Sequence, residues 1–380
     1  MKNLVLLITF ISFIFSCTPN VNKGSSYVKI EDSLLRIPAI EKYKSYIFQS
    51  GYLDKQYAYS DITRISDSTI LFACVSAPHI SDFVAADLVI SKSNDNGQTW
   101  SKPQKISHSV NEPFLNISAP AFLNIDKKRI LLFFGMKYNV SRIDIMCKES
   151  LDGGKTWGED KVVYAKNQGY QTLNNDRVIF NRGRIIIPIA IPDIPDNLSK
   201  SIQNAMSVFY YYSDDMGKTW QKSSKISIDN VALLEPGITA VAPKELLMNI
   251  RLNTGKVLFA RSFDNGITWN FEFSNIKSPT SPQKIIITKK GYLLMVWNNT
   301  DKNPYSNIGN RSPLSVAISK DKGRTWKRVL EIENSENNDF SYPSIYEDKD
   351  KFIISYYERY NKTNSYSIKC TQININAFFK

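Results

Sequence analysis

The chain of 380 residues has ordinary globular composition, with 42% hydrophobic, 12% aromatic and 22% charged residues and a formal net charge of +12. Its lysines and arginines are scattered through turns, and no helix-turn-helix, zinc-finger or aromatic-basic RNA motif accompanies them, so we expect no nucleic-acid partner. The only two histidines, His79 and His108, are too few to favour a multi-histidine zinc site or a Ser-His-Asp triad.

The N-terminal segment predicts export. In residues 1–16, Lys2 precedes an apolar run that reaches Phe15, which is typical of a signal peptide. The run ends before Cys17 in a pattern that resembles the lipobox of bacterial lipoproteins. That resemblance implies lipidation at Cys17, a tether over 17–40 and a protein anchored in a bacterial envelope, on its periplasmic or outer side. Plain secretion with cleavage nearby is the alternative.

Three cysteines follow Cys17, and each lies in a strand-like run. They are Cys74, Cys147 and Cys370. An odd number without paired spacing argues against a disulfide framework. We therefore interpret them as small buried hydrophobic residues.

A box with the pattern S-x-D-x-G-x-T-W occurs five times between strand-like segments. The boxes begin at Ser93, Ser150, Ser213, Ser262 and Ser319. The intervening segments are rich in Ile, Leu, Phe and Tyr, and no long amphipathic helical stretch interrupts them. Repeats of this kind indicate solenoids or propellers. The sequence therefore predicts an all-β fold over 41–380, a β-propeller of six four-stranded antiparallel blades.

Each box has the composition of a hairpin turn between the outer strands of a blade. Its Asp can accept backbone N–H groups, its Gly supplies a positive φ, and its Trp is expected to fill the gap beside the next blade. One acidic residue per box is too few for calcium. The sixth blade lacks a box, and we expect the early segment "KSYIFQSG" to pair with the C-terminal strands and close the ring.

The five boxes resemble the Asp-boxes of the sialidase superfamily, and the resemblance covers nearly the whole mature chain. Asp-boxes also occur in receptors and lectin-like propellers, so they indicate architecture better than chemistry. More specific is "LLEPGITAVAPKELLMNIR", which is similar to the sialidase segment that carries a catalytic glutamate and a carboxylate-binding arginine. The resemblance implies these roles for Glu235 and Arg251.

Three further segments extend the resemblance. "NRSPLSVAISKDKGRTW" offers Arg311 as the next carboxylate-binding arginine, and "SYPSIYEDKDKFIISYYE" is similar to the strand of the nucleophilic tyrosine, which implies that role for Tyr342. "TILFACVSAPHISDFVAADLVISKS" is similar to the stretch that holds the acid/base aspartate. Its position favours Asp82, with Asp87 as the second candidate.

The implied chemistry is coherent. The anomeric carbon of a sialic acid bears a carboxylate that would repel an anionic nucleophile, and retaining sialidases use tyrosine instead. A glutamate accepts the phenol proton, an aspartic acid protonates the leaving oxygen, and arginines bind the carboxylate bidentately. This mechanism requires no metal and no cofactor.

One departure from the family pattern concerns its first carboxylate-binding arginine. The segment "YAYSDITRI" places Ala58 where that arginine belongs, and Arg36 in "LLRIPAI" precedes the expected closing strand, so we interpret Arg36 as lying outside the family position. A loop that returns Arg36, another cation, or a different substrate would account for the departure. In the inner strand "NNDRVIF", Arg177 with Asp176 is a candidate substitute, and an ion pair between these two residues is the structural alternative.

The sequence thus predicts an exo-glycosidase that resembles exo-α-sialidase and removes terminal sialic acid, or a related acidic sugar, with retention through a tyrosine nucleophile. Its partners would be sialylated or other acidic glycans and, through the N-terminal lipid, a membrane, and we expect a monomer. A glycosidase of the same fold that acts on a non-sialic polysaccharide is one alternative. A glycan-binding propeller without catalytic activity is the other.

Overall fold

The computed structural model describes residues 27–31, 42–108, 115–166, 169–302, 309–374 and 378. Strands dominate this part of the chain, in which the only helical segments are α1 (Leu198–Asn204) and the 3₁₀ turn η1 (Tyr52–Asp54). The predicted all-β fold is therefore confirmed. The expected export signal, Cys17 and Arg36 lie outside the described residues. No helix within the described ranges has the length and apolar character needed to cross a membrane.

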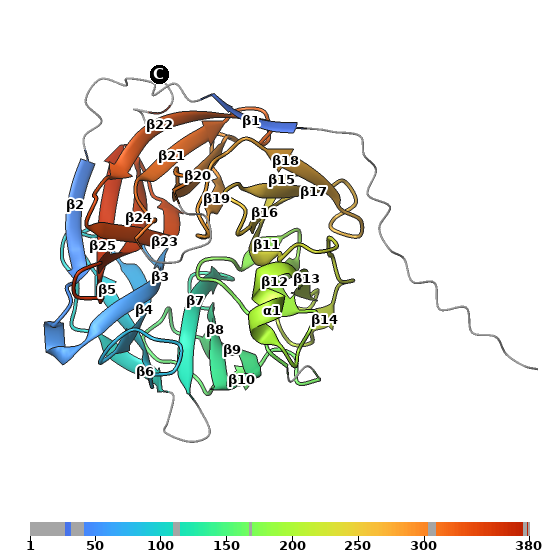
Figure 1. Cartoon of the computed structure of the whole chain (residues 1–380). Helices are drawn as coiled ribbons and strands as arrows, with labels where there is room; N and C mark the ends of the chain where they lie inside the picture. The colour runs from blue at the N-terminus through green and yellow to red at the C-terminus, as the bar shows by residue number, and fades with distance from the viewer. Residues whose placement is uncertain are drawn as a thin grey trace, which may run out of the picture.

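Three sheets of four antiparallel strands follow one another along the first half of the chain (Figure 1). The first contains β3 (Gln56–Arg64), β4 (Ile70–Ala77), β5 (Asp87–Ser93) and β6 (Gln104–His108). The second contains β7 (Asn116–Asn124), β8 (Ile130–Asn139), β9 (Arg142–Ser150) and β10 (Lys161–Val162). The third contains β11 (Ile179–Asn181), β12 (Arg184–Pro192), β13 (Met206–Ser213) and β14 (Gln221–Lys222).

The next two groups of four strands are joined into one nine-stranded sheet by β1 (Tyr27–Glu31), which pairs in parallel with β18 and β22. One group contains β15 (Leu234–Ala242), β16 (Glu245–Arg251), β17 (Leu258–Ser262) and β18 (Asn270–Ser274). The other contains β19 (Lys284–Ile287), β20 (Leu293–Asn298), β21 (Leu314–Ser319) and β22 (Thr325–Glu333).

The last sheet combines an early strand with the last three strands of the described chain. It contains β23 (Asn338–Glu347), β24 (Lys351–Tyr360), β25 (Ser365–Asn374) and the early strand β2 (Lys42–Phe48). Strand β2 pairs antiparallel with β25, with Ser45 opposite Cys370, so the predicted pairing of the early segment with the C-terminal strands is confirmed. This pairing covers the edge that β25 would otherwise expose.

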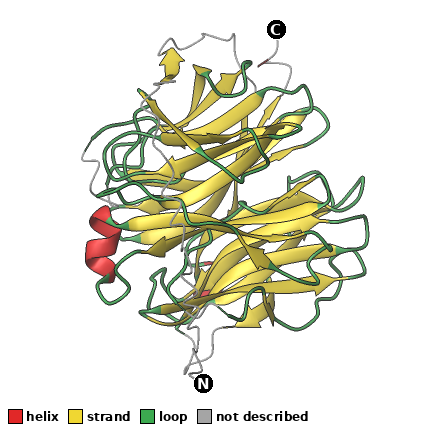
Figure 2. Ribbon diagram, turned by 90° about the vertical axis from the view of Figure 1, so that its right-hand side faces the viewer, coloured by secondary structure: helices red, strands yellow, loops and turns green. Residues whose placement is uncertain are grey.

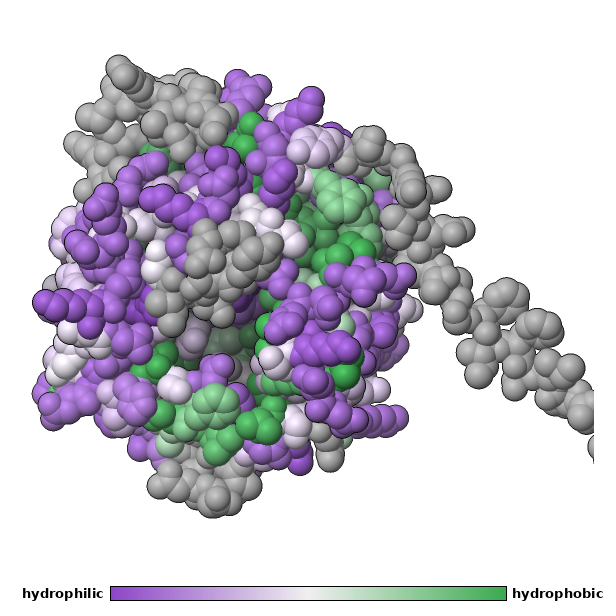
Figure 3. Space-filling view, viewed as in Figure 1, coloured by the Kyte–Doolittle hydropathy of each residue, from purple (hydrophilic) through white to green (hydrophobic). Residues whose placement is uncertain are grey.

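The sheets stand around a common centre, and β3, β7, β11, β19 and β23 lie close to it (Figure 1). Strand β3 contacts both β7 and β23, and β15 contacts β19. The side view shows the strands running between two loop-rich ends (Figure 2). Seen along the axis, one end is mostly hydrophilic and hollowed near its middle (Figure 3). The arrangement is a β-propeller-like fold.

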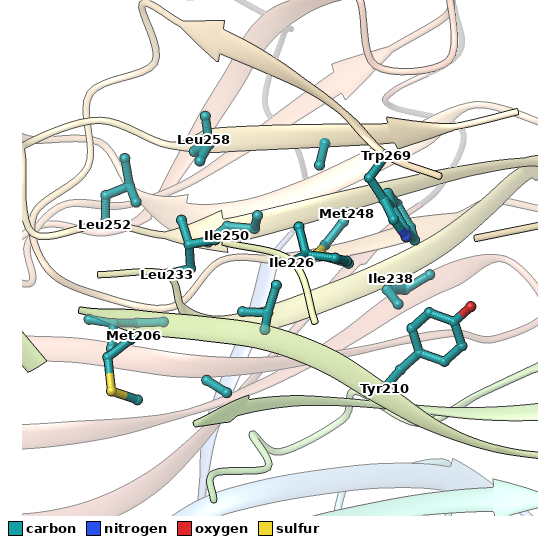
Figure 4. Close-up of a cluster of buried hydrophobic side chains, with 14 of the residues drawn as sticks. Met206, Tyr210, Ile226, Leu233, Ile238, Met248, Ile250, Leu252, Leu258 and Trp269 are labelled. Atoms are coloured by element: carbon teal, nitrogen blue, oxygen red, sulfur yellow. The ribbon is translucent and has the colours of Figure 1, made fainter. Parts of the chain in front are cut away.

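The hydrophobic core is divided into clusters that lie between successive groups of strands. Between the third and fourth groups, for example, Tyr210 of β13 packs with Ile238 of β15, Met248 of β16 and Trp269 (Figure 4). Corresponding clusters lie between the other neighbouring groups, including one that joins the last sheet to the first. Burial of apolar surface on both faces of each sheet holds the ring together.

The boxes form hydrogen-bonded turns. In the box of β13–β14, the Ser213 hydroxyl donates to Asp215 Oδ1 (2.7 Å) and accepts the N–H of Gly217 (2.7 Å), while Thr219 donates its N–H (2.8 Å) and its hydroxyl (2.6 Å) to Asp215. The same contacts recur around Asp95, Asp152, Asp264 and Asp321. The aspartate therefore stabilises the turn.

The expected position of the box tryptophan is corrected by the structure. Trp269, which follows β17, packs against the preceding sheet and not against the next one. The turn folds over that preceding sheet, where the Tyr210 hydroxyl donates to the carbonyl oxygen of Gly266 (3.0 Å). A Cβ atom on Gly266 would lie 2.7 Å from this hydroxyl, so glycine permits the close approach.

Candidate active site

A cavity of about 410 Å³ opens at the hollowed end of the ring. Five of the predicted site residues line it: Asp82, Glu235, Arg251, Arg311 and Tyr342. A larger hollow of about 610 Å³ lies between the outer strands β10 and β14 and is lined by none of them. The first cavity is therefore the candidate active site.

Tyr342, Glu235 and Arg251 form a connected chain of hydrogen bonds. The Tyr342 hydroxyl donates to Glu235 Oε1 (2.8 Å), and the Arg251 guanidinium donates from Nη1 to Glu235 Oε2 (2.7 Å). Tyr342 lies on β23, Glu235 on β15 and Arg251 at the end of β16, where it is the cross-strand neighbour of Leu234. Three strands from two separate sheets thus bring a phenol, a carboxylate and a guanidinium together.

Arg311 completes this side of the cavity. Its guanidinium lies 5.4 Å from the centre of the Tyr342 ring, and it donates to the Tyr357 hydroxyl and to the carbonyl oxygen of Thr280 (3.1 Å). Thr280 also accepts the Nε–H of Arg251 through its hydroxyl (3.0 Å). A single threonine therefore anchors both arginines, which are only 7% and 4% exposed.

The charges in this cluster reinforce one another. Burial alone would raise the pKa of Glu235, but the Arg251 charge and the hydrogen bonds from Arg251 and Tyr342 hold that pKa below its ordinary value. Burial, and then the negative charge of Glu235, raise the pKa of Tyr342 well above its ordinary value. The site therefore holds an ionised glutamate hydrogen-bonded to a neutral phenol.

The two candidate acid/base aspartates lie in different places. Asp82 follows β4 and lines the cavity as an exposed side chain. Asp87, at the start of β5, contacts Nδ1 of His108 (2.5 Å) and Nζ of Lys105 (3.6 Å) and is not among the residues that line the cavity. The geometry favours Asp82.

Neither Arg177 nor Asp176 lines the cavity, in contrast to their predicted role as substrate-binding residues. Arg177 is 2% exposed and donates to the carbonyl oxygen of Gln283 (2.6 Å). Asp176 pairs with Lys284 (2.7 Å), so the alternative of an ion pair with Arg177 is also corrected. Asp176 further accepts the N–H of Ile345 (2.9 Å). Both residues lie in the turn that precedes β11 (Ile179–Asn181), so the inner strand expected over "NNDRVIF" begins only after them.

The departure at Ala58 has a structural explanation. Ala58 is fully buried in the cluster between the last and first sheets, and Tyr59 lines the cavity in its place. The ladder between β3 and β4 shifts register between Ala58 and Ser60, which leaves Tyr59 as a bulged residue with φ 51°. Its ring meets the Tyr342 ring edge-on at 4.7 Å. A tyrosine edge therefore occupies the part of the cavity where the family arginine was expected.

The sequence did not single out several residues that support the site. Tyr357 stacks on Tyr342 with ring centres 5.5 Å apart, and Thr280 anchors the arginines as described. Asn175 is fully buried and donates from Nδ2 to the carbonyl oxygens of Tyr342 (3.1 Å) and Ser60 (2.7 Å). The crowding of polar residues in "NNDRVIF" was the only sequence signal for any of them.

Comparisons with known proteins show the family of the chain. Residues 81–354 match the model of the BNR repeat-like domain family. A sialidase of Paraclostridium sordellii is 26% identical over 284 residues, which cover 63% of this chain and 67% of that protein. The chain therefore belongs to the BNR repeat-like family and to the sialidase superfamily that its boxes resemble.

Solved structures show the same fold at low sequence identity. A Dyadobacter fermentans protein of unknown function aligns with a TM-score of 0.66 and 19% identity over 89% of this chain and all of that chain. Trypanosoma rangeli sialidase aligns with a TM-score of 0.70 and 14% identity over 90% of this chain, which spans 60% of that protein. The Trypanosoma rangeli enzyme has also been solved in complex with sialic acid.

Proposed function

We propose that this protein is a retaining exo-glycosidase that hydrolyses terminal sialic acid, or a closely related acidic sugar, from glycoconjugates. The single observation that carries the proposal is the hydrogen-bonded chain from Tyr342 through Glu235 to Arg251, with Arg311 beside it. We further propose that the six groups of four strands are six propeller blades, with the five boxes as hairpins between the outer strands of five of them.

In the proposed reaction, the substrate carboxylate binds Arg251 and Arg311, which offer paired donors to its two oxygens. Binding compensates the positive charge of Arg251, which otherwise holds the pKa of Glu235 down. Glu235 then becomes a stronger base toward the Tyr342 hydroxyl, to which it is already hydrogen-bonded. The substrate therefore activates the nucleophile by binding.

Tyr342 Oη attacks the anomeric carbon as its proton passes to Glu235, and Asp82 gives a proton to the leaving oxygen. The bond from the anomeric carbon to the leaving oxygen breaks as the bond to Tyr342 forms. Water, deprotonated by Asp82, then attacks the same carbon, and the released phenolate recovers its proton from Glu235. Two displacements at one carbon give net retention.

Beneath the reacting groups, we propose that Asp176, Lys284 and Arg177 serve as support. The ion pair of Asp176 with Lys284 satisfies charge that would otherwise be buried alone. Arg177 attracts Glu235 from within the ring. These contacts fix the inner strands that carry the catalytic side chains.

The test is release of free sugar. Purified protein should liberate sialic acid from at least one of the 2,3-, 2,6- or 2,8-linked substrates, and Tyr342→Phe should abolish the release. If no linkage yields free sialic acid, the sialidase proposal fails. Binding of sialosides without turnover, unaffected by changes at Glu235, would favour a glycan-binding propeller.

A second substrate class is favoured by one observation. Tyr59 occupies the part of the cavity where a third carboxylate-binding arginine was expected. Arg359 also lines the cavity but is paired with Asp339, so Arg251 and Arg311 are the two arginines that we propose meet the carboxylate. A glycosidase of this fold that acts on another acidic sugar, such as a uronic acid in a polysaccharide, would need fewer cationic groups in its cavity. A panel of acidic glycans, scored by released monosaccharide, separates the two classes.

A further inference from the structure

The loop that carries Asp82 connects β4 to β5 and runs over residues 78–86. Asp82 is exposed and its neighbour Phe83 is 62% exposed, whereas Ile80 and Val84 on either side pack against a small buried cluster. Proton transfer to a leaving oxygen requires the acid to lie within hydrogen-bond reach of it. Contacts to the loop backbone on either side of Asp82 would help to fix its position.

Asn116, the first residue of β7, makes such a contact from the neighbouring sheet. Its side chain is 7% exposed, and Nδ2 donates to the carbonyl oxygens of Ser81 (2.9 Å) and Val84 (2.8 Å). These two carbonyls bracket Asp82 in the sequence. Both protons of one buried amide are thus used to hold the backbone on either side of the candidate acid.

Lys137 acts on the same loop from the adjacent strand. It is the cross-strand partner of Asn116 on β8, is 7% exposed and lines the cavity. Its ammonium lies 4.4 Å from the centre of the Phe83 ring. Burial lowers the pKa of Lys137, and the negative charge of Asp82 acts in the opposite direction, so the two side chains lie within electrostatic reach.

We propose that Asn116, assisted by Lys137, is a positioning residue that holds the loop of Asp82 so that the acid reaches the leaving oxygen. This inference rests on the proposed glycosidase function. It assigns a distinct task to the second sheet, which contributes neither the nucleophile nor the arginines. Loss of the two hydrogen bonds from Asn116 should impair proton delivery by Asp82 more than it impairs binding of the substrate carboxylate.

The chain offers a matched control on the same strand. Asn124, the last residue of β7, also donates two hydrogen bonds from Nδ2 to the first sheet, to Thr63 Oγ1 (2.8 Å) and to the carbonyl oxygen of Arg64 (2.9 Å). It lies at the opposite end of the strand and is not among the cavity-lining residues. Asn124→Ala therefore removes the same kind of contact between the same two sheets without touching the loop of Asp82.

The experiment compares two leaving groups in wild type, Asn116→Ala and Asn124→Ala. A nitrophenyl glycoside needs little protonation on departure, whereas a natural glycoside with a sugar leaving group needs the acid. General acid catalysis contributes about 10²–10⁴-fold. We expect Asn116→Ala to lower kcat/KM on the natural glycoside by about 10- to 100-fold and on the nitrophenyl glycoside by less than about 3-fold, as partial loss of that contribution. Asn124→Ala should change both substrates equally.

The outcomes separate the inference from the proposed function. If wild type hydrolyses neither substrate, the proposed function fails. If wild type is active and Asn116→Ala slows both substrates by one factor, as Asn124→Ala does, the positioning role is overturned. Should Asn116→Ala fail to fold, Lys137→Met provides the second test, with the natural substrate again affected more than the nitrophenyl one. Equal effects of Lys137→Met on both would refute the proposal.

Discussion

Glu235→Gln tests the central cluster most directly. The substitution keeps the shape of the side chain but removes the base and the negative charge that pairs with Arg251 at 2.7 Å. Loss of a general base costs about 10²–10⁴-fold in rate, or about 3–5 kcal/mol of barrier. We expect kcat to fall by this amount while the protein remains folded, because the amide oxygen can still accept from Arg251.

The same variant should bind the acidic product more tightly. In the wild type, Glu235 competes with the ligand carboxylate for Arg251, and a hydrogen bond to a charged group contributes about 1.5–3 kcal/mol. Removing the competitor should lower the dissociation constant for free sialic acid by about 10-fold, measured by calorimetry, as the lower end of that range implies. Weaker product binding, or a kcat above about a tenth of the wild-type value, would refute the reasoning.

A control for general damage lies on the neighbouring strand, at the opposite end of β16 from Arg251. Glu245 begins β16 and pairs with the fully buried Arg261 at 2.9 Å. Glu245→Gln removes a comparable buried ion pair far from the cavity. Glu245→Gln should lower thermal stability by about as much as Glu235→Gln does, and it should leave kcat and product binding unchanged.

Three further predictions follow from the same structure. Tyr342→Phe should remove turnover while retaining sialic acid binding, measured by hydrolysis and calorimetry, and turnover equal to wild type would show that another group is the nucleophile. Gly154→Ala should be less stable than Gly291→Ala by about 1 kcal/mol in denaturant unfolding, because both glycines have φ near +78° but only the Cβ at Gly154 would meet Leu71, at 2.5 Å. The hydrogen bonds from the Thr99 hydroxyl and N–H lower the pKa of Asp95 to about 2. The stability that the ionised Asp95 contributes is therefore present above about pH 4, the unfolded value, and is lost as the pH falls toward 2. In thermal melts over this range, the melting temperature of Asp95→Asn should fall less than that of the wild type.

The fold could be predicted largely because the boxes repeat. Each box fixes a turn through contacts among its own residues, so the pattern S-x-D-x-G-x-T-W is a local signal that needs no tertiary information. The prediction of the direction in which the box tryptophan packs was wrong for the opposite reason. It depends on how one sheet lies against another, as Tyr210 and Gly266 show, and no local pattern encodes that relation.

The sequence singled out residues that line the cavity where motif and strand coincide. Glu235 and Arg251 belong to one hairpin, and their spacing follows from the pairing of β15 with β16. Arg177 was misplaced because it precedes β11 and does not lie in the expected inner strand, so strand alternation does not say where its side chain points. Only the packed ring decides, and it buries Arg177 against the backbone of Gln283.

The inner strands share a backbone irregularity that accounts for the remaining misplaced position, Ala58. Register shifts in β3, β7, β15 and β23 surround one residue each with positive φ: Tyr59 (51°), Ala119 (58°), Glu235 (41°) and Tyr342 (55°). A left-handed conformation is costly for side chains other than glycine, and its recurrence at one level of the ring indicates that the surrounding structure imposes it. All four residues line the cavity.

A bulge inserts one residue and so reverses which side chains face the cavity beyond it. Counting along a regular strand therefore selects Ala58, whereas the bulge presents Tyr59. Tyr342 and Glu235, the proposed nucleophile and base, both lie at such bulges, and their side chains meet from two different sheets. The fold thus supplies equivalent bulged positions around one cavity, and the chemistry at each depends on which side chain the sequence places there.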